Sequence, residues 1–257
     1  MAAPLAAPAE TMTQDNVLHA EILPGWRTAD GRHMAALSLT LAPGWKTYWR
    51  SPGEAGIPPM FDWQGSTNLR GVDMRWPSPV VFHLNGLQSI GYHDRLVLPF
   101  EVTLADPAAS ADIALTIDLG VCRDICLPAM VELRAVLPPS GEPDPAITAA
   151  LNAAPVTGRR AGVSGISCQV EPIADGLRLT AAIDLPAQGG DETVVFEPAD
   201  ASIWVAESVT ARKAGRLTAQ TELVPPSGQP FALDRSGITV TVIGSGGSVE
   251  IVGCPAP

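Results

Sequence analysis

The segment DIALTIDLG, residues 112–120, alternates apolar and polar side chains along its length. Polar Thr116 and Asp118 stand between apolar residues at every second position. Side chains of a β-strand point in turn to the two faces of a sheet, so this period of two predicts a strand with one buried face. The apolar positions are Ile113, Leu115, Ile117 and Leu119.

The same alternation recurs in both halves of the chain. Other examples are ALSLTLA at 36–42, LRLTAAI at 177–183 and GITVTVIG at 237–244. In the first of these, Leu37, Leu39 and Leu41 point one way and Ser38 and Thr40 the other. Together with 25 prolines and 24 glycines, which supply frequent turns, these strands predict an all-β chain with antiparallel sheets.

Composition excludes some classes of partner. The formal net charge is −11, whereas a nucleic-acid footprint is basic, so we expect no nucleic-acid binding. No apolar run is long enough to span a bilayer, and we expect the chain as given to be soluble. The start, MAAPLAAPAETMTQ, has neither the charged nor the apolar region of a signal peptide, and residues 1–16 are expected to form the flexible head of an exported chain.

A stretch rich in Pro, Gly and Ala at 137–162 interrupts the strand pattern, with one possible short helix at 145–153. We therefore predict a linker at 139–162 between two domains, 17–138 and 163–257. Each has the length and strand spacing of an immunoglobulin-like β-sandwich.

The segment GVCRDICLPAM, residues 120–130, holds two of the four cysteines. On one extended strand, the Cα atoms of Cys122 and Cys126 would lie about 13 Å apart, whereas a disulfide needs about 7 Å or less. The pair can close only if the chain turns between them, as a hairpin tip or a helical turn, and Asp124 is a suitable turn residue. We expect the pair at the edge or end of a sheet.

Geometry alone leaves three roles open for this pair. A disulfide that encloses so few residues stabilises a domain by about 2 kcal/mol or less, which favours redox exchange over a structural staple. Two thiols with Met130 nearby would also suit Cu(I). A closed zinc site needs four ligands, and His83 and His93 are distant in sequence, so we expect no zinc.

Four blocks in order resemble the amino-terminal periplasmic domain of the DsbD/ScsB thiol:disulfide interchange family. They are GWKTYWRSPGEAGIPPMFDW, WPSPVVF, GYHDRLVLPFEVTL and GVCRDICLPAMVEL, and the resemblance covers residues 25–138. It implies an immunoglobulin-like periplasmic domain that takes electrons from a membrane-embedded relay through a thioredoxin-like domain. The domain would act as a thiol:disulfide oxidoreductase on thioredoxin-fold partners, without cofactor or metal. The alternative is a non-catalytic sandwich with structural disulfides or a Cu(I)-handling thiol pair.

Applied residue by residue, the resemblance implies that Cys126 forms the mixed disulfide with partners and that Cys122 is the resolving cysteine. The family's cap loop would end in a segment that includes Tyr92 and Asp94. Alignment on the glycine at 86 puts Leu84 where the family has a cap aromatic residue, with Asn85 beside it. Because Leu84 is aliphatic, we expect it to cover less of the sulfur of the cysteine pair than an aromatic cap residue would.

Two further groups of residues have structural interpretations. Trp45, Tyr48 and Trp49 in GWKTYWR are expected in the core or, alternatively, at a partner-docking surface. Cys168 and Cys254 lie 86 residues apart, and in an exported chain we expect them to form a structural disulfide; the alternative is a second redox pair, for which there is no local motif. Closing so long a loop would contribute about 4 kcal/mol in the chain-entropy model.

Overall fold

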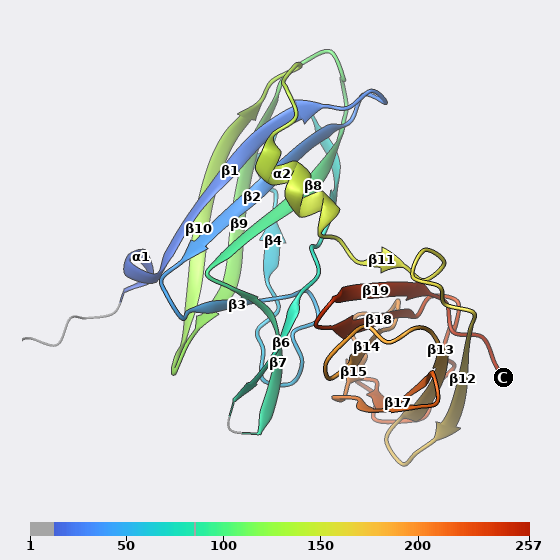
Figure 1. Cartoon of the computed structure of the whole chain (residues 1–257). Coiled ribbons are helices and arrows are strands. Elements are labelled where there is room, and N and C mark those ends of the chain that lie inside the picture. The colour runs from blue at the N-terminus through green and yellow to red at the C-terminus, as the bar shows by residue number, and fades with distance from the viewer. Residues whose placement is uncertain (1–12, 85) are drawn as a thin grey trace, which may run out of the picture.

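The computed structural model describes residues 13–84 and 86–257. These residues form two β-sandwiches, each made of two sheets, with a short helix near the chain connection between them (Figure 1). We call β1 to β10 the first sandwich and β11 to β19 the second sandwich. The all-β, immunoglobulin-like architecture predicted from the alternation is confirmed.

The first sandwich consists of two antiparallel sheets. One has the order β1 (Leu18–Arg27), β2 (His33–Leu41), β8 (Arg95–Leu104), β5 (Leu69–Met74). The other has the order β10 (Cys126–Leu137), β9 (Ala111–Cys122), β3 (Lys46–Tyr48), β7 (Leu87–His93), β6 (Val80–Leu84), and β4 (Met60–Asp62) also pairs with β9. The second of these sheets carries the cysteine hairpin.

The core of the first sandwich follows the predicted alternation. The four apolar residues of β9 named above are buried between the sheets, as are the three leucines of β2, whereas Asp118 is exposed. One polar position differs from the prediction, because Ser38 is also buried. Strand β2 is covered on both faces near its start, where Met34 and Ala36 pack against Ile147 of a helix.

That helix is α2 (Pro145–Asn152), in the segment predicted as a linker. Asp144 caps it, accepting hydrogen bonds from the N–H groups of Ala146 and Ile147, and a proline opens its first turn. Ile147 is fully buried. The short helix expected at 145–153 is therefore present, and it packs on the first sandwich.

The second sandwich also has two sheets and its own core. One sheet has the order β11 (Val156–Thr157), β19 (Gly247–Val252), β18 (Thr239–Gly244), β14 (Thr193–Glu197). The other has the order β12 (Gly165–Pro172), β13 (Leu177–Asp184), β17 (Arg216–Val224), β15 (Trp204–Val205), and β16 (Val209–Lys213) also pairs with β17. All pairs are antiparallel except β11 with β19, which is parallel.

Residues 1–12 of the predicted head lie outside the described part of the chain. Gln14, at the start of α1 (Gln14–Val17), exchanges two hydrogen bonds with the backbone of Met130 on the edge strand β10, at 2.9 and 3.2 Å. Neither α1 nor α2, nor any other helix in the described ranges, is long and apolar enough to cross a membrane.

Candidate active site

Strand β9 turns into β10 at the cysteine pair. Cys122 and Cys126 face each other directly across the hairpin and form a disulfide, with Cα atoms 4.1 Å apart. The N–H of Arg123 donates to the carbonyl of Ile125 at 3.0 Å and closes the turn. The predicted hairpin tip is confirmed, and it places the disulfide at the end of the sheet, next to its edge strand β10.

The two sulfur-bearing residues differ in accessibility. Cys122 is 1% exposed, whereas Cys126 is an exposed residue. Cys122 lies on the second strand of its sheet, between β10 and β3, while Cys126 begins the edge strand. A protein that approaches the hairpin tip therefore meets Cys126 first.

Tyr48, on the neighbouring strand β3, contacts the disulfide. Its hydroxyl donates to the Sγ of Cys122 at 3.0 Å and lies 3.5 Å from the Sγ of Cys126. The residue is 2% exposed, and burial raises the pKa of its hydroxyl, so the group stays a proton donor at neutral pH. A Cβ at Gly120 would come within 3.0 Å of the Tyr48 ring, so glycine allows this close approach.

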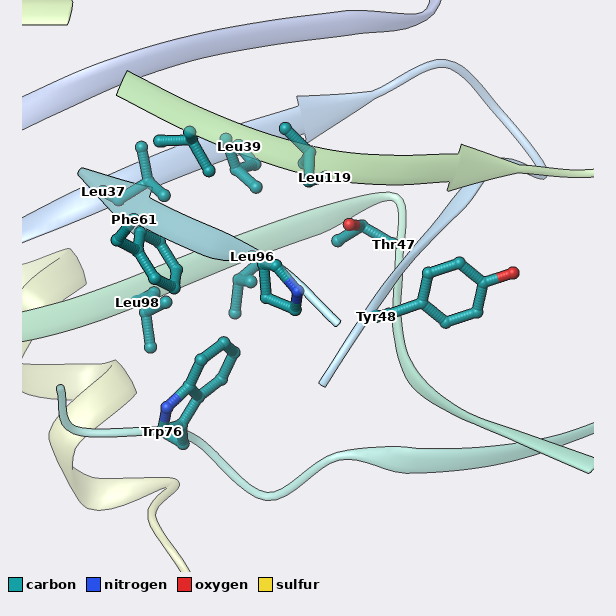
Figure 2. Close-up of a pocket in the computed structure, with 11 residues that line it drawn as sticks. Leu37, Leu39, Thr47, Tyr48, Phe61, Trp76, Leu96, Leu98 and Leu119 are labelled. Atoms are coloured by element: carbon teal, nitrogen blue, oxygen red, sulfur yellow. The ribbon is translucent and has the colours of Figure 1, made fainter. Parts of the chain in front are cut away.

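A largely apolar crevice lies beside Tyr48. Figure 2 shows a narrow crevice between the sheets, lined by leucines from β2, β8 and β9 together with Phe61 and Trp76. Its volume is about 10 Å³, which leaves no room for a ligand. In the same view the ring of Tyr48 points away from the leucines, and its hydroxyl is directed out of the crevice.

A lysine lies in the same row of the sheet as the buried cysteine. Lys46 pairs with Cys122 on one side and with His93 on the other. Its ammonium donates to the hydroxyl of Ser89 at 2.8 Å and lies 4.8 Å from the centre of the Phe82 ring. Burial lowers the pKa of Lys46. The arrangement places a partly desolvated cation on the face of the sheet that carries the cysteines.

The second pair of cysteines lies in a different environment. Cys168 and Cys254 form a disulfide with Cα atoms 5.4 Å apart, and both residues are at most 1% exposed. The N–H of Cys168 donates to Pro255, and the N–H of Cys254 donates to Arg235. This disulfide ties β12 to the last residues of the chain, within the core of the second sandwich.

Residues 14–138 match the family model described as thiol:disulfide interchange protein DsbD, N-terminal. This part of the chain belongs to that family. The predicted resemblance is thereby confirmed, and the DsbD-type domain is a module of thiol:disulfide interchange.

Similarity to solved structures extends beyond the DsbD-type domain. The N-terminal periplasmic domain of ScsB from Proteus mirabilis aligns with 96% of this chain and 96% of its own length, with a TM-score of 0.69 and 24% identity. Both sandwiches thus share its fold. The C-terminal domain of the AgI/II polypeptide BspA of Streptococcus agalactiae aligns with a TM-score of only 0.13, at 9% identity over 91% of this chain and 94% of its own length. No curated protein sequence matches the chain.

The residues predicted for the cap of the DsbD-type domain are dispersed. Leu84 ends β6 and is 50% exposed, and Asn85 lies outside the described residues. Asp94 is exposed in a left-handed turn, where a hydrogen bond with the neighbouring His93 at 2.6 Å lowers the pKa of its carboxyl. Tyr92 is buried, and its hydroxyl donates to the carbonyl of Pro77 at 2.8 Å. The predicted partner contact of Tyr92 stays a prediction, at a side chain that the fold buries.

Phe82 is an aromatic residue that the sequence analysis missed. It pairs with Ser89 across the β6–β7 hairpin, so its side chain lies on the same face of the sheet as Lys46, Tyr48 and Cys122. Its ring meets that of His93 edge to face, with centroids 6.3 Å apart. Alignment on the following glycine points to Leu84, although Phe82 lies only two residues earlier on the same strand.

The predicted core position of the GWKTYWR aromatics is confirmed, because Trp45, Tyr48 and Trp49 are each at most 2% exposed. Sequence analysis nevertheless missed the contact between Tyr48 and the cysteines, which depends on the pairing of β3 with β9.

The soft ligands considered for copper are spread along one strand. Met130 and Cys126 both lie on β10, four residues apart, which corresponds to about 13 Å in a strand. In the described ranges, no group of three or more His, Cys, Asp or Glu residues is arranged to hold a metal ion. Binding of one copper ion by both Met130 and Cys126 would require a backbone conformation other than the extended strand β10.

Proposed function

We propose that the DsbD-type domain is a periplasmic thiol:disulfide oxidoreductase. It passes reducing equivalents from a thioredoxin-like donor, which a membrane-embedded relay supplies, to thioredoxin-fold acceptors. Cys122 and Cys126 form the redox couple, and neither a cofactor nor a metal takes part. Membership of the DsbD family and the ScsB-like fold support this proposal, and the geometry of the hairpin tip supports the roles of its two sulfurs.

The observation that carries the proposal is the contrast between an exposed Cys126 and a buried Cys122 in one disulfide. Thiol–disulfide exchange needs one sulfur that an incoming protein can reach and a second that stays behind to resolve the intermediate. A purely structural staple would have no need of an exposed sulfur. In the second sandwich, by comparison, both cysteines of the Cys168–Cys254 disulfide are buried.

Electron transfer to an acceptor takes two displacement steps. The thiolate of Cys126 attacks one sulfur of the acceptor's disulfide, and the acceptor's other sulfur leaves as a thiolate. Cys122, after losing its proton, then attacks the Sγ of Cys126 and releases the acceptor's first sulfur. The acceptor gains two electrons and takes up two protons from water, and the Cys122–Cys126 disulfide is formed. A reduced thioredoxin-like donor restores the dithiol by the same steps in reverse.

Tyr48 acts on the second of these steps. In the reduced state its hydroxyl remains next to Cys122 and can donate to a thiolate there, which stabilises the nucleophile that resolves the mixed disulfide. Lys46, in the same row of the sheet, adds a positive charge that favours thiolate formation. Both groups come from β3, so a single strand positions the polar environment of the couple.

The reduction potential of Cys122–Cys126 tests the proposal. The domain would be equilibrated with glutathione buffers of known potential, alkylated and analysed by mass spectrometry. We expect a potential above about −300 mV, in the range of exchanging disulfides, and rapid oxidation of the reduced domain by oxidised thioredoxin. A potential below that value, together with no reaction with thioredoxin, would show that the disulfide is structural.

A further inference from the structure

The loop between β3 and β4, residues 51–59, has contacts on two sides. On the side of the cysteines, the hydroxyl of Tyr48 lies 3.5 Å from the carbonyl of Ala55. Ile57 packs so closely over Gly120 that an added Cβ there would lie 3.0 Å from its Cδ1. This loop therefore forms one flank of the disulfide.

On its other side the same loop faces the second sandwich. It forms one wall of an open groove of about 470 Å³, to which it contributes Pro52, Gly56 and Pro58. The opposite wall is the segment 201–205, where Trp204 on β15 is 51% exposed. A large aromatic side chain that is half exposed beside a groove is the kind of residue that anchors protein–protein contacts.

The groove is held in a fixed shape by charged contacts between the sandwiches. Arg50, which directly precedes the loop, makes two hydrogen bonds to the carboxylate of Glu197, at 2.7 and 2.9 Å, and one to Glu250 at 2.8 Å. Ile243 of the second sandwich belongs to the core of the first, and Val195 packs against that core. Figure 1 shows β14 and β15 on the side of the first sandwich that carries β6 and β7. The groove therefore exists before any partner binds.

The charges of the groove restrict its occupant. The cation of Arg50 is already paired with two carboxylates. Glu54 is exposed and lines the groove, and its carboxylate accepts from the N–H of Glu207, which is also exposed and lies two residues beyond the opposite wall. The rim is acidic and the wall at Trp204 is aromatic. A matching protein surface is apolar and carries no acidic residue at that edge.

We infer that this groove is a second contact site for the thioredoxin-fold protein that reacts at Cys126. The inference rests on the proposed function and adds a role for the second sandwich, which gives the partner an anchor at Trp204 while the reaction takes place at the hairpin tip. The loop at 51–59 connects the two contacts, because it lies against both the disulfide and the groove.

Rates of exchange test this inference. The reduced full chain would be mixed with oxidised thioredoxin, and the rate of exchange would be measured. The rate at which dithiothreitol reduces the Cys122–Cys126 disulfide of the same protein would serve as the internal reference. With Trp204→Ala, we expect the thioredoxin rate, relative to the dithiothreitol rate, to fall roughly fivefold to thirtyfold. The matched control is Val252→Ala, an apolar side chain on β19 that is 73% exposed, which should leave the ratio unchanged. An unchanged ratio for Trp204→Ala would overturn the inference.

A trapped complex gives a second test. Cys122→Ala retains the sulfur of Cys126, whose thiolate can displace nitrothiobenzoate from a thioredoxin that carries this leaving group on its single active-site cysteine. In this mixed disulfide we expect slower amide hydrogen exchange in residues 51–58 and 201–208 than in the free chain. Protection confined to residues 120–130 would contradict the groove but leave the proposed function intact. Failure of wild-type chain and thioredoxin to exchange at all would overturn both.

Discussion

Tyr48 donates a hydrogen bond to the buried sulfur of Cys122 across two neighbouring strands, at a distance of 3.0 Å. The tyrosine is on β3 and the cysteine ends β9, which pair only over a short length. The contact links β3 to the redox couple. It also distinguishes the two sulfurs, because the hydroxyl is closer to Cys122 than to Cys126.

Replacing Tyr48 with Phe should slow the resolving step of exchange. The ring would still fill the space over Gly120, but the thiolate of Cys122 would lose a donor, and a hydrogen bond to a charged group contributes about 1.5–3 kcal/mol. We expect a tenfold or greater fall in the rate at which the mixed disulfide is resolved, measured by quenching in acid and separating the complex. Tyr92→Phe is the matched control, since it removes a buried hydroxyl that bonds to Pro77. Equal slowing by both variants would refute the specific role of Tyr48.

Lys46→Met should raise the pKa of the reactive thiol. Lys46 pairs in register with Cys122 on the neighbouring strand, and a cation close to a thiol favours the thiolate, so removing the ammonium should shift the pKa of the Cys122 thiol upward. A rise of about half a unit would lower the thiolate fraction at pH 7 about threefold. The effect should vanish at a pH above the thiol pKa, where both proteins are thiolates. Titration of thiolate absorbance near 240 nm measures it, and an unchanged pKa would exclude a role for this lysine.

Single cysteine variants should differ in trapping. With Cys122→Ala, the exposed Cys126 can attack a thioredoxin-fold partner, and no second sulfur resolves the product, so a covalent complex accumulates. With Cys126→Ala, the remaining sulfur is on a residue that is 1% exposed, and little complex should form. Non-reducing electrophoresis gives the yields. Comparable yields from both variants would contradict the assignment of attacking and resolving sulfurs.

The two disulfides should differ in their response to mild reductant. The exposed Cys126 allows a thiol to attack the first disulfide, whereas both residues of Cys168–Cys254 are enclosed by the core of the second sandwich. Treatment with a low concentration of dithiothreitol, followed by alkylation and mass spectrometry, should therefore detect two free thiols, at Cys122 and Cys126. Four thiols released together, or none, would count against a labile redox couple beside a structural disulfide.

The strands could be predicted from the sequence because their signal is local. The alternation at Ile113 to Leu119 specifies which residues of β9 face the core, whatever strands lie opposite. The turn between the cysteines was also accessible, since the limits on disulfide geometry exclude an extended segment. Local pattern and simple geometry were sufficient for both.

Features that depend on pairing between distant strands could not be predicted in this way. The contact of Tyr48 with Cys122 spans 74 positions, and it requires the register of β3 on β9. Phe82 was missed because the pairing of β6 with β7 decides on which face of the sheet its side chain lies, and this pairing cannot be read from the sequence. The burial of Met34 and Ala36 on the outer face of β2 involves Ile147 of α2, which is more than a hundred residues away in the sequence.

The position of α2 leads to a prediction about where the DsbD-type domain ends. A chain cut after residue 140 would expose Met34 and Ala36 and lose Ile147, whose burial alone stabilises by about 1.5–3 kcal/mol. A chain cut after residue 154 keeps the helix. We expect the longer form to unfold cooperatively in urea and to retain exchange with thioredoxin. Its exchange rate should equal that of the full chain with Trp204→Ala, because the truncated chain lacks the wall of the groove that contains Trp204. The shorter form should be less stable by at least the contribution of Ile147. If neither form unfolds cooperatively, the two sandwiches depend on a common core through Ile243, and the predicted division into domains is wrong.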